Sequence, residues 1–308
     1  MLRIERILCP IDFSECTARA YDYAQSLARH YQANLFLNHV VDFGLPPYEY
    51  YTPAIDFEEV FRTTCADARG QLQEFARSHT RIGVQPECFV QEGAVTDSVL
   101  SFAEAQMVDL IVMGTHGLKG LDRVALGSVA EKVLRKARCP VLVVRKAGHD
   151  FISPGSAQEP IQLRKILFCT DFSDPSRRAI EYARSAAAEY NAELTLLHVL
   201  EDMASSANIE EAIATATHQL DKLIPPGAVK GGKIKTLVRI GRAYQQIIEL
   251  ALETQADLLI MAVRGRNAVD LAVFGSTTYR VIQLGPCPVL AVHILKAEIM
   301  SSAGIVQP

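Results

Sequence analysis

Two short glycine-containing segments are the parts of this chain best suited to hold a phosphate group. The first is Gly114-Thr-His-Gly117, and the second, after nine further residues, is Gly127-Ser128-Val129. Glycine lets the backbone come close to a ligand. A helix that begins at the second segment offers unpaired N–H groups and a positive dipole end, and its Ser128 hydroxyl can donate to a phosphate oxygen. With Lys119 and Arg123 in the intervening loop, the segments predict a triphosphate cradle.

The glycine spacing alone leaves a simpler alternative open, in which Gly114 and Gly117 form a tight turn and Ser128 only caps a helix. The chain contains neither a P-loop motif nor a Gly-x-Gly-x-x-Gly motif. His116 is a candidate acid or base beside the phosphates, although a solvent-facing loop residue is the favoured interpretation. No paired carboxylates and no nucleophile–base pair occur at a recognisable spacing, so we assign no catalytic residue.

Alternating strands and helices must position these segments. The apolar patterns predict strands at 4–10, 34–41, 84–91, 110–113 and 140–145, and helices after Ser14 and at 55–79, 95–105 and 127–137. Such alternation is typical of an α/β fold with a doubly wound, five-stranded parallel sheet and flavodoxin-like layering. Ligands bind these sheets at the carboxyl ends of the strands, where the winding reverses. We expect strands one and four to flank that point, so that Asp12 and Gly114 face one crevice.

The whole pattern occurs twice. The segment Arg6-Ile-Leu-Cys-Pro-Ile-Asp-Phe-Ser14 returns in related form 159 residues later, and Gly127-Ser128 returns as Gly275-Ser276 at an offset of 148. A repeat of this length has the size of a domain. We therefore expect two tandem domains: domain 1 at 1–147, a linker at 148–163, domain 2 at 164–296, and a loose tail at 297–308.

Three segments resemble the universal stress protein family. They are the glycine pattern before a helix that leads to Cys139-Pro-Val-Leu142, the segment Pro10-Ile-Asp-Phe-Ser14, and the segment Leu37-Asn-His-Val40. The resemblance covers nearly the whole chain, twice, and implies a tandem member with two adenine nucleotide alpha hydrolase-like domains. The ATP-binding branch of the family implies ATP or a related adenine nucleotide as ligand. It also implies Mg²⁺ held through the phosphates, with no metal ligand from the protein.

The resemblance also implies roles for matching positions of domain 1. Pro10, Ile11 and Asp12 would line the adenosine half, Val40 would meet the adenine through its main chain, Met113 and Gly114 would lie along the nucleotide, and Gly117, Gly127, Ser128 and Val129 would hold the phosphates. Asp12 and its repeat Asp171 have a second interpretation as helix-start acids. His39 and His198 are better interpreted as packed strand-end histidines than as catalysts.

Domain 2 departs from this pattern. Ala262 replaces the first glycine, Arg264 replaces His116, and Cys169 replaces Pro10, while Asn267 and Leu271 replace Lys119 and Arg123. A methyl group on Ala262 would crowd a phosphate or forbid a positive φ angle, so we expect domain 1 to bind nucleotide better. Alternatively, the charge of Arg264 compensates for the lost glycine, and both domains bind nucleotide. The candidate contacts of domain 2 are Thr170, Asp171, Val199, Met261, Arg264, Gly265, Gly275, Ser276 and Thr277.

The composition of the chain limits the functional classes to which the protein can belong. The 308 residues are 49% hydrophobic and carry a net charge of −4, which gives no electrostatic signature of nucleic acid or membrane binding. The N-terminal sequence lacks a signal-peptide pattern, and no apolar run has transmembrane length, so we expect a cytoplasmic protein. The seven cysteines form no CxxC pair and no metal-ligand spacing, which favours reduced packing residues.

These inferences favour an ATP-binding regulatory module in the stress response rather than an efficient enzyme. A slow ATPase and a scaffold that binds partners without nucleotide are the alternatives. The apolar last strands, Val141–Arg145 and Val289–His293, need cover as sheet edges. Family dimers pair across this strand, so we expect the two domains to form that dimer within one chain, and further homodimerisation is compatible with the sequence.

Overall fold

The fold repeats one β/α pattern in two halves. The computed structural model describes residues 3–43, 57–80, 83–115, 126–145, 149–152, 159–201, 208–224, 234–263 and 275–293. The first half contains β1 (Arg6–Pro10), α1 (Glu15–Tyr31), β2 (Asn34–Val41), α2 (Phe57–His79), β3 (Glu87–Glu92), α3 (Val95–Ala105), β4 (Leu110–Gly114), α4 (Ser128–Lys136) and β5 (Val141–Val144). These bounds confirm the expected strands and helices to within three residues at either end.

The second half follows the same order. It contains β6 (Lys165–Cys169), α5 (Asp174–Tyr190), β7 (Glu193–Leu200), α6 (Ile209–Lys222), β8 (Ile234–Ile240), α7 (Ala243–Thr254), β9 (Leu258–Ala262), α8 (Ser276–Leu284) and β10 (Val289–Val292). The corresponding helices α1 and α5 share their end structures, because Ser14 and Ser173 both cap a helix start and Gln32 and Asn191 both end one in the left-handed conformation.

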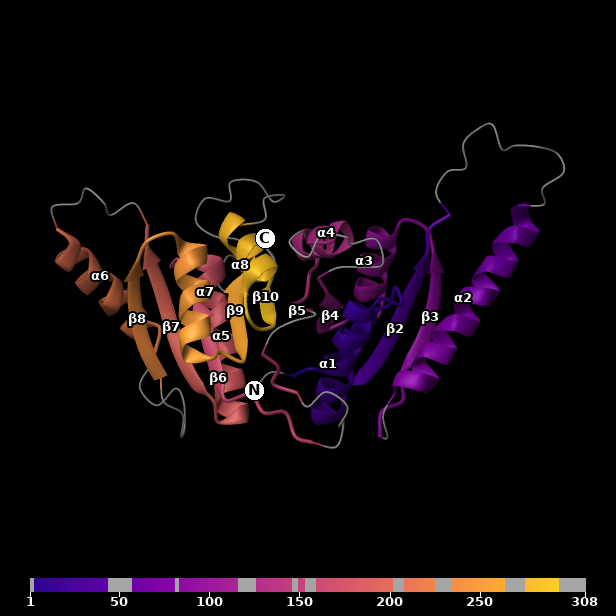
Figure 1. The fold of residues 1–308 in the computed structure, drawn as a ribbon, viewed down its shortest axis with the longest axis horizontal. Coiled ribbons are helices and arrows are strands. Elements are labelled where there is room, and N and C mark those ends of the chain that lie inside the picture. Colours follow the sequence, from indigo (N-terminus) through magenta and orange to yellow (C-terminus); the bar gives the residue numbers. More distant parts are fainter. Residues whose placement is uncertain are drawn as a thin grey trace, which may run out of the picture.

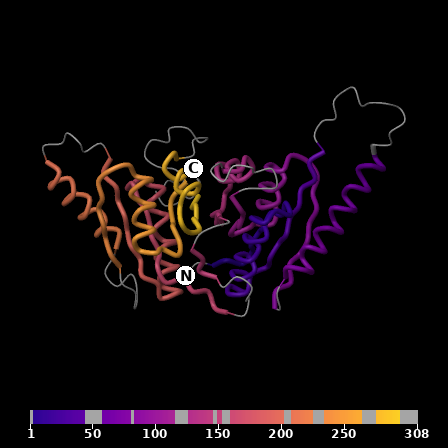
Figure 2. Tube along the Cα trace, in the orientation of Figure 1, coloured from indigo at the N-terminus to yellow at the C-terminus, as the bar shows by residue number. Residues whose placement is uncertain are grey.

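The strands form one ten-stranded sheet in the order β3-β2-β1-β4-β5-β10-β9-β6-β7-β8. All pairs are parallel except β5 and β10, which pair antiparallel with Leu142 opposite Leu290. The position of β1 beside β4, and of β6 beside β9, confirms that the winding reverses between the first and fourth strands of each half. Figure 1 shows β5 and β10 at the centre and α2 and α6 at the outer ends, and Figure 2 separates the halves by colour.

Helices cover both faces of the sheet, and the core cluster on each face contains residues of both halves. One cluster lies on the face of α1 and α5 and includes Leu142 and Leu290 together with Phe151 from the connecting segment. The other face is covered by α3, α4, α7 and α8. Because residues of both halves pack in the same clusters, the described parts of the two halves form a continuous hydrophobic interior.

The segment between the halves packs against both of them. Phe151 is 3% exposed and contacts the ring of Tyr23 edge-on, with 4.9 Å between centroids. Asp150 accepts hydrogen bonds from the Tyr23 hydroxyl and, at 2.5 Å, from the Arg19 guanidinium. His149 Nε2 lies 2.5 Å from Oδ1 of Asp257 in the second half. These described residues of the connection are therefore anchored in the fold.

The C-terminal ends of α1 and α5 meet where the halves join. His30 Nε2 lies 2.8 Å from a carboxylate oxygen of Glu189, and the Tyr190 hydroxyl donates to the Tyr31 hydroxyl at 3.2 Å. The contacting positions are equivalents in the repeat, offset by 159 residues. The two halves are thus related by an approximate two-fold axis that passes between these helices.

Tyr31 gives this junction a dependence on alkaline pH. Burial raises the pKa of Tyr31 to about 12 from its usual 10. Above pH 10 the unfolded chain loses the Tyr31 proton, whereas the folded chain keeps it. The contribution of Tyr31 to the free energy of unfolding is therefore complete below pH 10 and is lost as the pH rises toward 12. We expect the free energy of unfolding of the native sequence to fall more steeply over this window than that of Tyr31→Phe. Urea denaturation at a series of pH values measures both slopes, and parallel curves would contradict the expectation.

The seven cysteines form no disulfide. Cys139 and Cys287 precede the last strand of their halves, and burial raises the pKa of each thiol to about 12. Thiols with so small a thiolate fraction are poor nucleophiles, which agrees with their interpretation as packing residues. Among the described helices, none combines the length and the apolar character that a membrane crossing requires.

Candidate functional site

The candidate site of the first half lies at the carboxyl ends of β1 and β4. The two strands are neighbours, with Ile7 opposite Leu110 and Leu8 opposite Ile111. Asp12 therefore follows β1 at the same edge of the sheet at which Gly114 ends β4 (Figure 1). The structure thus brings the first and fourth strand ends together, as the doubly wound pattern predicts.

A tight turn links Asp12 to the start of α1. Oδ1 of Asp12 accepts hydrogen bonds from the main-chain N–H of Ser14 at 3.0 Å and from the Thr17 hydroxyl. The Ser14 hydroxyl in turn accepts from the N–H of Thr17 at 3.2 Å and caps the helix. Asp12 therefore has the role of a helix-start acid, and both of its bonds use the same carboxylate oxygen. A ligand contact of the other oxygen, Oδ2, is compatible with this role.

The turn holds a phenylalanine in an unusual backbone conformation. Phe13 has a φ of 63°, and its repeat equivalent Phe172 has 61°, in the left-handed region that bulky residues seldom occupy. The Phe13 ring packs on His39 with 4.7 Å between centroids, and Phe172 packs on His198 at 4.2 Å. Because the same strained turn occurs in both halves, it is a regular feature of the repeated fold at this edge of the sheet.

Both strand-end histidines are held by the same contact. Nδ1 of His39 lies 2.7 Å from the carbonyl oxygen of Ile11, and Nδ1 of His198 lies 2.8 Å from that of Thr170. In each case the ring nitrogen donates to the segment that follows the first strand of its half. The arrangement supports the structural interpretation of these histidines, since each ties two strand ends together.

The two ends of the glycine-containing loop meet at its base. The N–H of Gly127 donates to the carbonyl of Thr115 at 2.8 Å, and the N–H of Thr115 donates to Val144 at 3.1 Å. Helix α4 begins directly afterwards, at the exposed Ser128, with no side-chain cap at Gly127. The first N–H groups of the helix have no partner within it. The site therefore presents an uncapped helix start beside the end of β4.

Gly114 is needed for packing rather than for an unusual backbone angle. It does not adopt a positive φ. A Cβ atom built on it would lie 3.0 Å from Cβ of Cys16 and 3.1 Å from the carbonyl carbon and oxygen of Cys16, in the first turn of α1. The expectation that a methyl group here forbids a positive φ is therefore wrong as a reason for this glycine, whereas the expectation that it crowds a phosphate stays a prediction. In the second half Pro175 stands at the position of Cys16, so Ala262 faces a different helix start.

The predicted apolar contacts of the first half lie on both faces of the sheet, with Ile11 buried in the cluster on the α1 and α5 face. Val40 and Met113 are buried in the cluster on the side of α3 and α4, the face on which α4 begins. The sequence analysis missed a polar pair on β2 and β3: Asn38 is 1% exposed, and its Nδ2 donates to Oε1 of Gln91 at 2.8 Å. The polar Asn38 within the largely apolar run of β2 is the feature of the sequence that could have indicated this pair.

The second half repeats this architecture with one added contact. The N–H of Gly275 donates to Val263 at 3.2 Å, which closes the corresponding loop, and α8 begins at the exposed Ser276. The Thr278 hydroxyl donates to the carbonyl of Ala262 at 3.1 Å. Asp171 keeps the turn contact, since its Oδ1 accepts from the N–H of Ser173 at 3.0 Å. The helix start and the acidic turn are thus present in both halves.

Several predicted contacts lie outside the described residues. They are His116, Gly117, Lys119 and Arg123 in the first half, and Arg264 and Gly265 in the second. Within the described ranges, no group of three or more His, Cys, Asp or Glu side chains could hold a metal ion. The arrangement formed by the described residues is an edge with a helix start that none of their side chains caps, an acidic turn and a buried apolar wall. Such an edge can bind an anionic group through main-chain donors.

Comparison with known proteins gives one consistent family. The model of the universal stress protein family matches residues 3–145 and again residues 162–293. Universal stress protein MJ0531 of Methanocaldococcus jannaschii is 33% identical over 142 residues, which are 46% of this chain and 82% of that protein. A universal stress protein of Mycolicibacterium smegmatis is 25% identical over 298 residues, covering 93% of this chain and 96% of its own length.

A solved structure shares the two-part fold. The crystal structure of a universal stress protein from Archaeoglobus fulgidus superposes with a TM-score of 0.67 at 22% identity, over 93% of this chain and 95% of that one. At this identity the likeness supports the fold alone. Together with the family match in each half, it accounts for the repeat that the sequence displays.

Proposed function

The chain belongs to the universal stress protein family, and from this premise we propose that it is a regulatory module that binds ATP in the crevice of its first half. The observation that carries the proposal is the uncapped start of α4. A hydrogen bond of 2.8 Å from Gly127 to Thr115 fixes this helix start next to the end of β4. Main-chain N–H groups that are held in this way stabilise a phosphate group without rearrangement.

We propose one orientation for an adenine nucleotide in this crevice. The phosphates would lie against Gly127, Ser128 and Val129, and the adenosine half along Pro10, Ile11, Asp12, Val40, Met113 and Gly114. The buried wall suits the base, and the carboxylate of Asp12 suits a ribose hydroxyl, because a carboxylate oxygen accepts hydrogen bonds. We infer that Mg²⁺ binds through the phosphate oxygens, with Gly117, His116, Lys119 and Arg123 completing the phosphate end.

We propose that the second half binds nucleotide more weakly than the first. We attribute the difference to the positions of the loop cations, and the methyl group of Ala262 beside a phosphate remains the second predicted cause. The two loop cations of the first half, Lys119 and Arg123, correspond to Asn267 and Leu271. Arg264 and Arg266 stand where His116 and Leu118 stand in the first half, so the second loop keeps two cations at other positions and some attraction for phosphates. Its remaining contacts would be Thr170, Asp171, Val199, Met261, Gly265, Gly275, Ser276 and Thr277.

We also propose that the pairing of β5 with β10 does within this chain what a dimer does for single-domain relatives. The proposal is supported by the antiparallel register of Leu142 with Leu290 and by the contact of His30 with Glu189. A parallel sheet that ends in the apolar strand Val141–Val144 needs such cover.

Calorimetric titration with ATP and magnesium tests the proposed function. We expect saturable heat with a stoichiometry near one nucleotide per chain, together with turnover far below the enzyme median of roughly 10 per second. No heat with any adenine nucleotide would refute nucleotide binding. A turnover near that median would refute the regulatory module in favour of an ATPase.

A further inference from the structure

The approximate two-fold axis between the halves implies that each groove beside it has an equivalent. The axis relates α1 to α5 and places Tyr31 against Tyr190. It also relates Arg19 to Arg178 and Tyr23 to Tyr182, at the same offset of 159 residues. A segment that packs on α1 beside the axis therefore has a matching surface on α5.

The connecting segment fills the groove on α1. Asp150 binds Arg19 and the Tyr23 hydroxyl, and Phe151 packs on the Tyr23 ring with 3% of its surface exposed. The carbonyl of Phe151 also accepts from the N–H of Gln162 at 2.8 Å, just before β6. One acidic residue and the apolar residue after it thus make the principal contacts.

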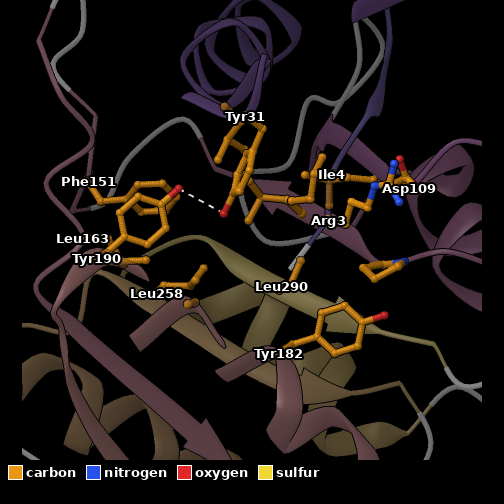
Figure 3. A pocket seen from close by; sticks show the side chains of 15 residues that line it. Arg3, Ile4, Tyr31, Asp109, Phe151, Leu163, Tyr182, Tyr190, Leu258 and Leu290 are labelled. Atoms are coloured by element: carbon orange, nitrogen blue, oxygen red, sulfur yellow. Dashed lines mark hydrogen bonds between the residues drawn. The ribbon is translucent and has the colours of Figure 1, made fainter. Parts of the chain in front are cut away.

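The matching groove on α5 is an open pocket of about 290 Å³ (Figure 3). Its lining includes Arg3, Asp109, Pro140, Tyr182, Ala186 and Leu290. Figure 3 shows Tyr182 beside Leu290, with Arg3 and Asp109 farther along the wall. The pocket extends to Leu27 and Phe151 on the α1 side, and Ala186 is the repeat equivalent of Leu27, so the α5 side carries the smaller side chain. Its walls are mainly apolar, with an arginine and an acid at one end.

The C-terminal tail carries the sequence that the connecting segment uses. At the offset of 148 residues that relates β5 to β10, Asp150 corresponds to Glu298, Phe151 to Ile299 and Ile152 to Met300. The number of residues from the end of β5 to Phe151 equals the number from the end of β10 to Ile299. The tail can therefore reach the pocket by the path that the connecting segment takes in the first half.

The geometry points to the pocket on α5 as the docking site of residues 297–300 of the same chain. Glu298 accepts from the Tyr182 hydroxyl and the Arg178 guanidinium, as Asp150 does from Tyr23 and Arg19. Ile299 and Met300 fill the apolar volume, which Ala186 leaves wide enough for them.

The repeat predicts one further contact of the docked tail and one contact that it lacks. The carbonyl of Ile299 accepts from the N–H of Arg3, the repeat equivalent of Gln162. Ala297 stands where His149 contacts Asp257, so the corresponding contact to Asp109 is absent from the docked tail. The inference does not depend on nucleotide binding, because this pocket lies on the α1 and α5 face of the sheet, away from the start of α4.

A single-tryptophan reporter tests the docking. The chain contains no tryptophan, so Ile299→Trp introduces the only indole. Phe151→Trp, on the filled groove, serves as the buried reference, and Val306→Trp, beyond the docked residues 297–300, serves as the reference outside the pocket. We expect the emission of Ile299→Trp to be blue-shifted, and its quenching by acrylamide to be reduced, toward the values of Phe151→Trp. Adding Glu298→Gln should move both readouts toward Val306→Trp.

Three outcomes would overturn the docking. Emission and quenching of Ile299→Trp equal to those of Val306→Trp would show that the tail leaves the pocket to solvent or to a small molecule. A signal that changes on dilution would show that the tail binds a second copy. The unsubstituted chain gives a further measurement: if removing residues 297–308 leaves hydrogen exchange at Arg3 and Ile4 unchanged, the tail does not pair there.

Discussion

Replacing Ser128 with glutamate is expected to abolish measurable ATP binding by the first half while the fold remains intact. Ser128 is the exposed first residue of α4, and the N-cap position before it is Gly127, which makes no side-chain cap. A carboxylate in the first turn of a helix is favourable for the helix itself. The same carboxylate repels a phosphate about 4 Å away by roughly 4 kcal/mol at an effective dielectric constant near 20. That energy corresponds to a loss of about a thousandfold in affinity.

Two matched substitutions separate this repulsion from other effects. Ser276→Glu places the same charge at the start of α8 and should leave the binding of the first nucleotide unchanged. Ser128→Ala removes only the hydroxyl and should cost about 1 kcal/mol, a typical hydrogen-bond contribution. Calorimetry with ATP and magnesium measures all three variants. If Ser128→Glu binds as tightly as the native protein, the start of α4 is not the phosphate site.

Replacing Gly114 with alanine is expected to lower the free energy of unfolding by about 1–3 kcal/mol, the usual cost of overpacking a well-packed core. The new Cβ would approach Cβ, C and O of Cys16 to within 3.0–3.1 Å. Two of these three atoms belong to the backbone of α1, so no side-chain rotation relieves the contact. The strain would act on the turn that holds Asp12, and we expect weaker nucleotide binding as a secondary effect.

Chemical denaturation of Gly114→Ala and of the reciprocal change, Ala262→Gly, tests this interpretation. The reciprocal change creates no clash and removes one buried methyl group, so its cost should be closer to the roughly 0.8 kcal/mol of a single buried methylene. An unfolding midpoint of Gly114→Ala equal to that of the native protein would contradict the packing role. Equal losses in the two variants would contradict the asymmetry between the halves.

The sequence was sufficient to predict the elements and their winding. Apolar periodicity placed β2 at Asn34–Val41 and α3 at Val95–Ala105 without error, because these segments have strong patterns and clear end signals. The repeat then supported each assignment twice. The meeting of Asp12 and Gly114 at one edge followed from the rule for doubly wound sheets, and the observed neighbours β1 and β4 confirm it.

The contacts that the sequence could not predict depend on register and on packing across layers. The pair Asn38 and Gln91 requires the alignment of β2 with β3, which no local pattern specifies. The reason for Gly114 lies in the distance to Cys16 on another layer. Phe151 and Ile152 lie in a segment whose glycines and prolines indicate a linker, yet both side chains are buried. The composition of this segment indicates that it connects the two halves, but it does not indicate which residues its side chains pack against.

The continuous sheet also bears on how the two copies can evolve. In a dimer of identical chains, every substitution at the contact appears on both sides at once, and each surface must remain complementary to itself. Here β5 and β10 come from different stretches of one polypeptide, so Leu27 and Ala186, or His30 and Glu189, are free to diverge as unlike partners. Because both surfaces belong to one polypeptide, each can specialise separately, and every molecule contains both of them.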